Sequence, residues 1–251
     1  MRNLFDLSGK TAVVTGANTG LGQGIAVALA AAGASVVLVG RSSMAETEKL
    51  IKNEGGETLS ILADLSTNEP LQDIVDKAVA WKGSLDILVN NAGIIRRADA
   101  IDFSEADWDA VMNVNLKSLF FLSQAAAKQM LKQGGGKIIN IASLLSFQGG
   151  IRIPSYTASK SGLAGLTRLL ACEWAGKNIN VNAIAPGYFV TNNTMALRED
   201  AQRNEAILAR IPAGRWGQPE DIGGAAVFLA SRAADYMHGA IVPVDGGWLA
   251  R

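Results

Sequence analysis

A tyrosine and a lysine four positions apart carry the strongest chemical signal in the sequence. Tyr156 and Lys160 stand in the run Tyr-Thr-Ala-Ser-Lys, and residues i and i+4 of a helix lie on one face. A free phenol has a pKa of about 10, and lowering it to about 7 requires roughly 4 kcal/mol in favour of the anion. A positive charge about 4 Å away supplies roughly that amount at an effective dielectric constant near 20. The pair is therefore predicted to do acid–base chemistry on a hydroxyl or ketone, with Tyr156 exchanging the proton.

A glycine-rich turn is the second chemical feature. It reads Thr15-Gly16-Ala17-Asn18-Thr19-Gly20-Leu21-Gly22 and stands between an apolar run and an amphipathic stretch. Glycines leave room where a Cβ would block a diphosphate, and the amino end of a helix presents free N–H groups to such an anion. The turn is therefore predicted to bind a dinucleotide at the first strand-to-helix crossover.

Short β-rich runs alternate with helical stretches along the whole chain. The predicted strands are 11–14, 36–39, 59–62, 87–89, 138–141, 181–184 and 241–244. Several runs are continuously apolar, as expected for parallel strands covered on both faces. The alternation predicts an α/β fold, a Rossmann-like doubly wound parallel sheet of about seven strands in one domain spanning residues 1–251. The polar, helix-like segment near residues 190–212 interrupts the pattern and is expected to form a lid over a site.

Composition excludes several classes of function. The 251 residues are 49% hydrophobic and 18% charged, which is typical of a folded domain. Lys plus Arg and Asp plus Glu each number 23, so the chain has no basic excess for a nucleic-acid backbone. One cysteine, Cys172, excludes an internal disulfide, and with one histidine, His238, it cannot form a soft-ligand metal site. A Ser-His-Asp triad would require His238.

No targeting segment is visible in the sequence. The opening residues MRNLFDLSGK lack an apolar core, so a cytoplasmic location is expected. The stretch Thr11–Gly40 has no charged residue, but its many glycines and polar residues indicate buried strands and a helix rather than a membrane span.

The motifs together resemble the short-chain dehydrogenase/reductase family. The resemblance rests on the Thr-Gly-x-x-x-Gly-x-Gly spacing of residues 15–22 and on Asn90-Asn91-Ala92-Gly93. It also rests on Asp64, on Pro186-Gly187 with Thr191, on the Tyr156/Lys160 pair, and on Asp245-Gly246-Gly247. These motifs occur in the family's order over nearly the whole chain. The resemblance implies an NAD(P)-dependent oxidoreductase that interconverts a hydroxyl and a ketone.

The resemblance also assigns roles to individual residues. It implies a catalytic set of Asn115, Ser143, Tyr156 and Lys160, in which Ser143 holds the substrate oxygen and Asn115 supports a proton relay through water to the lysine. The implied cofactor contacts are Gly16, Asn18, Thr19, Gly20, Leu21, Gly22, Arg41, Ser42, Asp64, Leu65, Asn91, Ala92, Gly93, Tyr156, Lys160, Pro186, Gly187 and Thr191.

The end of the second predicted strand bears on the choice of cofactor. An acidic residue there would accept both ribose hydroxyls and repel a 2′-phosphate, but the sequence reads Gly40-Arg41-Ser42-Ser43. Arg41 can bind a 2′-phosphate through charge-assisted hydrogen bonds, so the sequence favours NADP(H). If Arg41 only stacks on adenine, either NADP(H) or NAD(H) binds.

Polar loops at the expected active edge point to a small anionic substrate. Candidate substrate contacts are Arg96, Ser143, Gln148, Arg152 and Asn192, with Arg97 beside the first of them. Arginines suit a carboxylate, although an arginine pair such as Arg96-Arg97 is also common in surface ion pairs. The loops resemble the sugar-acid branch of the family, whose members act on 2-deoxy-D-gluconate or 2-dehydro-3-deoxy-D-gluconate, often with NAD. The resemblance implies a homotetramer.

Two other functions stay open from the sequence. One is a carbonyl reductase for an acyl-carrier or steroid substrate. The other is a dinucleotide-binding sensor without chemistry, which is expected to have lost Tyr156 or Lys160. No nucleic-acid, membrane or metal partner is predicted. The C-terminal Trp248-Leu249 pair is expected either to pack on its own domain or to contact another subunit.

Overall fold

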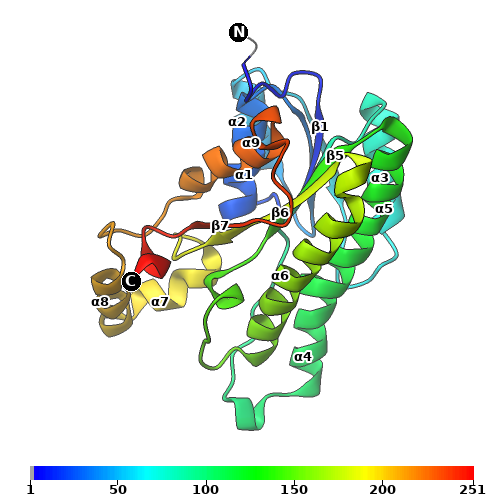
Figure 1. Cartoon of the computed structure of the whole chain (residues 1–251). Helices are drawn as coiled ribbons and strands as arrows, with labels where there is room; N and C mark the ends of the chain where they lie inside the picture. Colours follow the sequence, from blue (N-terminus) through cyan, green and yellow to red (C-terminus); the bar gives the residue numbers. More distant parts are fainter. Residues whose placement is uncertain (1–2) are drawn as a thin grey trace.

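The computed structural model describes residues 3–251, which form a parallel sheet covered by helices on both faces (Figure 1). The strands are β1 (Thr11–Thr15), β2 (Ser35–Gly40), β3 (Thr58–Leu62), β4 (Ile87–Asn90), β5 (Gly136–Ile141), β6 (Ile179–Pro186) and β7 (Ile241–Val244). The sheet order is β3-β2-β1-β4-β5-β6-β7, with every neighbouring pair parallel. The predicted fold class is confirmed, and each predicted strand lies within an observed one.

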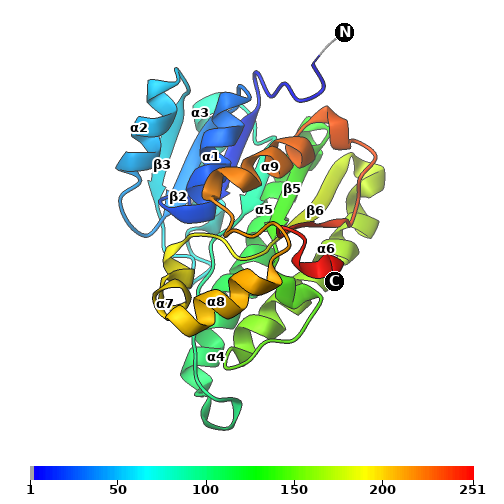
Figure 2. The ribbon, with the colours of Figure 1, turned by 90° about the vertical axis from the view of Figure 1, so that its left-hand side faces the viewer.

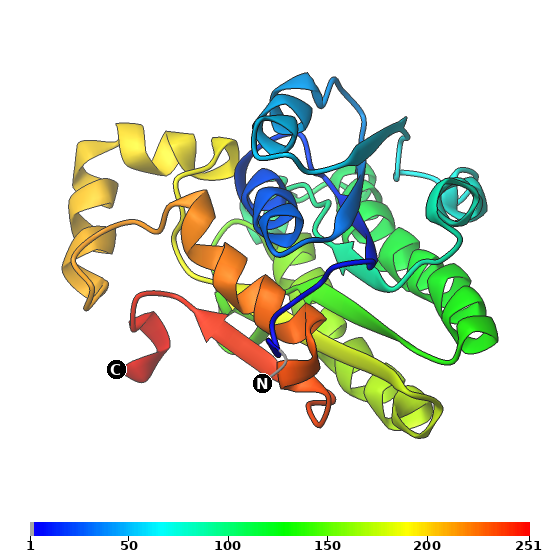
Figure 3. The ribbon, with the colours of Figure 1, turned by 90° about the horizontal axis from the view of Figure 1, so that it is seen from above.

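The helices connect these strands and cover them. They are α1 (Gly20–Ala31), α2 (Ala45–Asn53), α3 (Leu71–Lys82), α4 (Glu105–Met112), α5 (Ser118–Gln133), α6 (Pro154–Trp174), α7 (Met195–Glu199), α8 (Ala201–Arg210) and α9 (Gly223–Ala230). Helices α1, α2 and α9 share one apolar cluster with the sheet, and α3, α5 and α6 share another. Viewed from above, the two helical layers lie on opposite sides of the strands (Figure 3).

Alternation of side chains along β1 supplies both clusters. In β1, Ala12 and Val14 belong to the cluster with α1, whereas Val13 belongs to the cluster with α3 and α5. All five residues of β1 are buried, as the continuous apolar run predicts for a strand covered on both faces. Cys172 of α6 is exposed, whereas the preceding Leu170 and Ala171 form the buried face of that turn.

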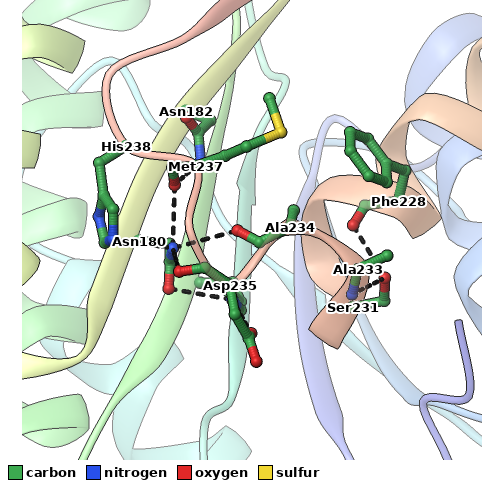
Figure 4. A network of polar contacts seen from close by, with 10 residues as sticks. Asn180, Asn182, Phe228, Ser231, Ala233, Ala234, Asp235, Met237 and His238 are labelled. Atoms are coloured by element: carbon green, nitrogen blue, oxygen red, sulfur yellow. Dashed lines mark hydrogen bonds and ion pairs between the residues drawn. The ribbon is translucent and has the colours of Figure 1, made fainter. Parts of the chain in front are cut away.

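A polar network at the amino end of β6 fixes the turn that leads into β7 (Figure 4). The side-chain amide of Asn180 donates to the carbonyl oxygens of Asp235 and Met237, at 2.9 Å each, and Lys137 donates to Asn180 Oδ1 at 3.0 Å. His238 Nε2 lies 3.3 Å from the same amide. This histidine therefore lies at the edge opposite Ser143, which follows the carboxyl end of β5, and the two cannot share a catalytic triad.

The segment near residues 190–212 extends beyond the carboxyl edge of the sheet. It folds into a short 3-10 turn, Asn192–Thr194, followed by α7 and α8, which lie in front of the sheet edge in the second view (Figure 2). Among the residues the structure describes, no helix is long and apolar enough to cross a membrane.

Candidate active site

The carboxyl ends of the central strands open into a cavity of about 340 Å³. Because parallel strands end at one edge, loops far apart in sequence meet there. Its lining includes Gly16 and Asn18–Gly22 after β1, Asn91–Gly93 after β4, Ser143 after β5, Pro186 and Gly187 at the end of β6, and Tyr156 and Lys160 from α6. Residues Thr191–Thr194 form another side of the cavity.

Two glycines of the turn, Gly16 and Gly22, occupy positions that a larger residue cannot take without strain or a clash. Gly16 has a φ of +64°, which a residue with a Cβ adopts only under strain. A Cβ on Gly22 would lie 2.1 Å from the Gly16 carbonyl oxygen and 2.4 Å from Asn91 Nδ2. The Asn91 side chain in turn donates to the Thr15 carbonyl oxygen at 2.8 Å. The turn is thereby held against β4, and the amino end of α1 faces the cavity.

A neighbouring cavity of about 360 Å³ continues from this turn. Gly16, Asn18, Ala92 and Gly93 line both cavities, and the second adds Arg41, Ser42, Asp64, Leu65 and Val114. Asn18 Nδ2 donates to Ser42 Oγ at 3.0 Å, which connects the glycine turn to the end of β2. All of the predicted cofactor residues line one cavity or the other, so their placement fits an extended dinucleotide.

Tyr156 and Ser143 both line the first cavity. Burial raises the pKa of the Tyr156 phenol, while a hydrogen bond with Ser143 and the positive charge of Arg97 act to lower that pKa. Ser143 Oγ also accepts from the Leu145 amide at 3.2 Å, which fixes the hydroxyl after β5. The phenol by itself is therefore a protonated donor at neutral pH.

Lys160 contributes differently from the sequence prediction. Its ammonium lies 5.7 Å from the Tyr156 ring centroid and donates to the Ile141 carbonyl oxygen at 2.5 Å. Burial lowers the pKa of Lys160 to about 8. The prediction that this charge alone makes the phenol acidic is wrong for the chain by itself, because burial outweighs the groups that stabilise the phenolate and Lys160 is not among those groups.

Burial of Lys160 predicts a specific pH dependence of stability. Between the folded pKa of about 8 and the unfolded pKa of about 10.4, the unfolded chain binds a proton that the folded chain does not. Stability due to this residue therefore rises with pH. From pH 7.5 to 9.5, the unfolding free energy of the native chain should rise by about 2 kcal/mol relative to Lys160→Met. Urea titrations at both pH values measure this difference; parallel pH dependences would contradict it.

Asn115 occupies the π-helical segment Asn113–Lys117 between α4 and α5, a kind of irregularity that is frequent at functional sites. The residue is fully buried. Its Oδ1 accepts from the Ile94 amide at 2.9 Å, and its Nδ2 donates to the Ile94 carbonyl oxygen at 3.0 Å. Asn115 thus fixes the loop after β4 and does not line the cavity. Its role in a proton relay stays a prediction.

A third cavity, of about 520 Å³, adjoins the first and extends beneath α8. Ser143 and Tyr156 line both. The remaining lining includes Gln148, Tyr188 and Trp248, and three arginines: Arg97, Arg203 and Arg210. We name this space the substrate cavity. Asn192 lines only the first cavity, although the adjacent Asn193 lines both.

Two predicted substrate residues are not brought to the substrate cavity. Arg96 forms an ion pair with Asp107 at 3.1 Å, and Arg152 forms one with Asp99 at 2.9 Å. Neither side chain lines the cavity. The sequence reasoning missed Arg203 and Arg210, because only the position of α8 over the sheet edge brings them there; their spacing on one helix face was the available signal.

Comparison with known proteins identifies the family. A family model described as enoyl-(acyl carrier protein) reductase matches residues 16–249. The 2-dehydro-3-deoxy-D-gluconate 5-dehydrogenase of Dickeya dadantii is 62% identical over 250 residues, 99% of each chain. The chain belongs to the short-chain dehydrogenase/reductase family. It is therefore an NAD(P)-dependent oxidoreductase.

Solved relatives agree with this assignment. A structure from Agrobacterium tumefaciens, provisionally named a 2-deoxy-D-gluconate 3-dehydrogenase and containing NADP, is 64% identical, with a TM-score of 0.94 and coverage of 100% of both chains. A gluconate 5-dehydrogenase from Burkholderia cenocepacia, in complex with NADP and tartrate, is 39% identical, with a TM-score of 0.93 and coverage of 99% of this chain and 98% of that one.

Proposed function

We propose that this enzyme interconverts a hydroxyl and a ketone on a small sugar acid of the 2-dehydro-3-deoxy-D-gluconate or 2-deoxy-D-gluconate type. The observation that carries the proposal is the lining of the substrate cavity. Ser143 and Tyr156 lie where it meets the first cavity, three arginines line it, and its lining, within residues 3–251, includes no Asp or Glu. Such a lining attracts an anionic substrate, and the names of the relatives support a sugar acid.

The proposed mechanism uses the catalytic set that the resemblance implied. Ser143 donates to the substrate oxygen and holds it beside Tyr156, whose hydroxyl gives a proton to a ketone oxygen or accepts one from an alcohol. The residues that line the glycine turn and the adjoining cavity would hold NAD(P), which would provide hydride chemistry at the carbon that bears this oxygen and, in its oxidised form, a positive charge. Lys160 keeps a cation in this buried region at neutral pH, since its pKa is about 8. Asn115 holds the loop that carries Ile94.

The glycine turn and the cavity next to it would hold the cofactor. The absence of a Cβ at Gly22 and the left-handed backbone at Gly16 let the turn fold tightly against Asn91. The amino end of α1 lines the first cavity, where its free N–H groups would face a diphosphate. Asp64 and Leu65 line the far cavity, where the adenosine would lie. NADP(H) is the favoured form, because the exposed Arg41 lines that cavity beside Ser42 and the carboxyl end of β2 carries no Asp or Glu.

Replacing Arg41 by Ala tests this preference. Because a hydrogen bond to a charged group contributes roughly 1.5–3 kcal/mol, the loss should weaken NADP binding by about 10- to 100-fold. NAD binding should change much less, since it lacks the 2′-phosphate. Fluorescence titration of the reduced cofactors gives both dissociation constants, and Arg168→Ala serves as an arginine control outside the cavities. Equal losses for the two cofactors would remove the case for NADP.

An absorbance screen tests the function itself. Sugar acids, uncharged sugars, steroids and acyl-carrier substrates are supplied with NAD or NADP, and nicotinamide absorbance is followed. We expect turnover of sugar acids and little of the uncharged compounds. Turnover confined to acyl-carrier or steroid substrates would favour the alternative carbonyl reductase. Cofactor binding with no turnover of any substrate would favour the sensor.

Location and assembly also stay predictions. We propose a cytoplasmic enzyme, which is compatible with a single exposed cysteine in a reducing compartment. We also propose the homotetramer implied by the family resemblance. The Trp248 side chain packs on its own domain, since it is 4% exposed and belongs to a cluster with Leu144, Ile207 and Trp216.

A further inference from the structure

The three arginines of the substrate cavity lie in two places. Arg97 follows the loop after β4 and donates to the Asn193 carbonyl oxygen at 3.1 Å. Arg203 and Arg210 are both on α8, seven residues and hence about two turns apart on one face. The residues shared with the first cavity include Ser143, Tyr156 and Asn193 but neither α8 arginine. The cavity therefore has a reacting end at Tyr156 and a remote end beneath α8.

Packing and hydrogen bonds hold the side chains at the remote end in place. The Arg210 guanidinium lies 4.0 Å from the Trp248 ring centroid, which is a favourable cation–π distance. The Trp248 indole donates to Gln148 Oε1 at 3.1 Å, and its ring packs on Tyr188 with centroids 4.6 Å apart. This packing restricts the guanidinium, so less side-chain entropy is lost when it binds a ligand.

The C-terminal turn holds Trp248 in this position. The two carboxylate oxygens of Asp245 accept from the amides of Gly247 and Leu249, each at 2.9 Å. Tyr188 packs in turn against Trp216, at 5.4 Å between centroids. The C-terminal turn thus holds Trp248 where its ring packs against the Arg210 guanidinium.

The α8 arginines are available to an anion. Among the described residues, the arginines in ion pairs are Arg96, Arg152 and Arg215, and neither Arg203 nor Arg210 is one of them. Burial raises the pKa of Tyr188, and the charges of Arg210 and Arg203 act against that rise. At Tyr156, where burial also raises the pKa, the opposing arginine charge is that of Arg97. The two groups of arginines therefore influence different ends of the cavity.

We propose that Arg203 and Arg210 bind the substrate carboxylate at the remote end of the cavity, an inference that rests on the proposed function. Binding there directs the reaction to a hydroxyl far from the carboxylate. Charge-assisted, bidentate contacts suit a carboxylate and a guanidinium. With the carboxylate beneath α8, the carbon beside Tyr156 is toward the other end of the carbon chain. This arrangement selects C5 of a six-carbon acid over C3. Arg97, next to Tyr156, then contacts the region of the reacting oxygen.

The test compares acids with their neutral amides. The kcat and KM are measured for 2-deoxy-D-gluconate, 2-dehydro-3-deoxy-D-gluconate and their C1 amides. Arg203→Gln and Arg210→Gln should each lower kcat/KM for the acids by about 10- to 100-fold, mostly through KM, and for the amides by less than about 2-fold. Arg210→Lys should retain more activity on the acids than Arg210→Gln. Arg97→Gln should affect acids and amides alike, and the ion-paired Arg96→Gln should affect neither.

The position of the new carbonyl is read by ¹³C NMR. We expect C5 in either acid. A carbonyl at C3 of 2-deoxy-D-gluconate, or equal losses on acids and amides in both α8 variants, would overturn the inference while leaving the proposed function intact. Failure of the native enzyme on every sugar acid would instead refute the proposed function. Melting temperatures of the variants identify any loss that comes from unfolding.

Discussion

Tyr156→Phe is expected to lower turnover by at least about 10²- to 10⁴-fold, the usual contribution of a positioned acid or base. The substitution removes only the phenol oxygen. The ring still fills its place beside Lys160, and the glycine turn is untouched. Cofactor affinity should therefore stay nearly unchanged. Steady-state absorbance gives kcat, and fluorescence titration with NADPH gives the dissociation constant.

Tyr236→Phe is the matched control. Tyr236 is fully exposed and outside the cavities, so the same deletion there should leave both measurements unchanged. Turnover retained by Tyr156→Phe would defeat the acid–base mechanism. Loss of both turnover and cofactor binding would show that the hydroxyl has a structural role, through its hydrogen bond with Ser143, rather than the proposed one.

Gly22→Ala is the second substitution from which we expect a large effect, and it should abolish cofactor binding. The added Cβ would lie 2.1 Å from the Gly16 carbonyl oxygen and 2.4 Å from Asn91 Nδ2. The first contact is with backbone, so the turn itself must move away from β4. That displacement moves the N–H groups that face the diphosphate, and overpacking of this kind destabilises a core by about 1–3 kcal/mol. Calorimetric titration with NADP and a urea titration measure the two effects.

Gly224→Ala controls for the loss of a glycine. Gly224 lies in α9, and a Cβ built there meets no atom within 4 Å. The variant should bind the cofactor like the native chain and be as stable or slightly more so, since Ala favours a helix over Gly. Native-like NADP binding by Gly22→Ala would show that the tight fit of this turn does not matter to the cofactor site.

Local sequence determined much of this protein. Short, largely apolar runs set the strands, as in β1 and β2, because strands buried on both faces are nearly continuously apolar. The glycines at 16 and 22 are required by backbone conformation and space. The spacing of Tyr156 and Lys160 brings both to the same cavity, since both lie on α6. Each of these signals acts over a single turn or strand.

Tertiary structure decided what depends on partners distant in sequence. Arg96 and Arg97 are adjacent and chemically alike, yet the first is held by Asp107 and the second lines the substrate cavity. Arg203 and Arg210 become candidate ligands only because α8 lies over the sheet edge and Trp248 reaches it from the C-terminus. The pKa of Tyr156 likewise follows burial more than its helical neighbour. Electrostatic and packing energies depend on distance through space, which periodicity within one element does not fix.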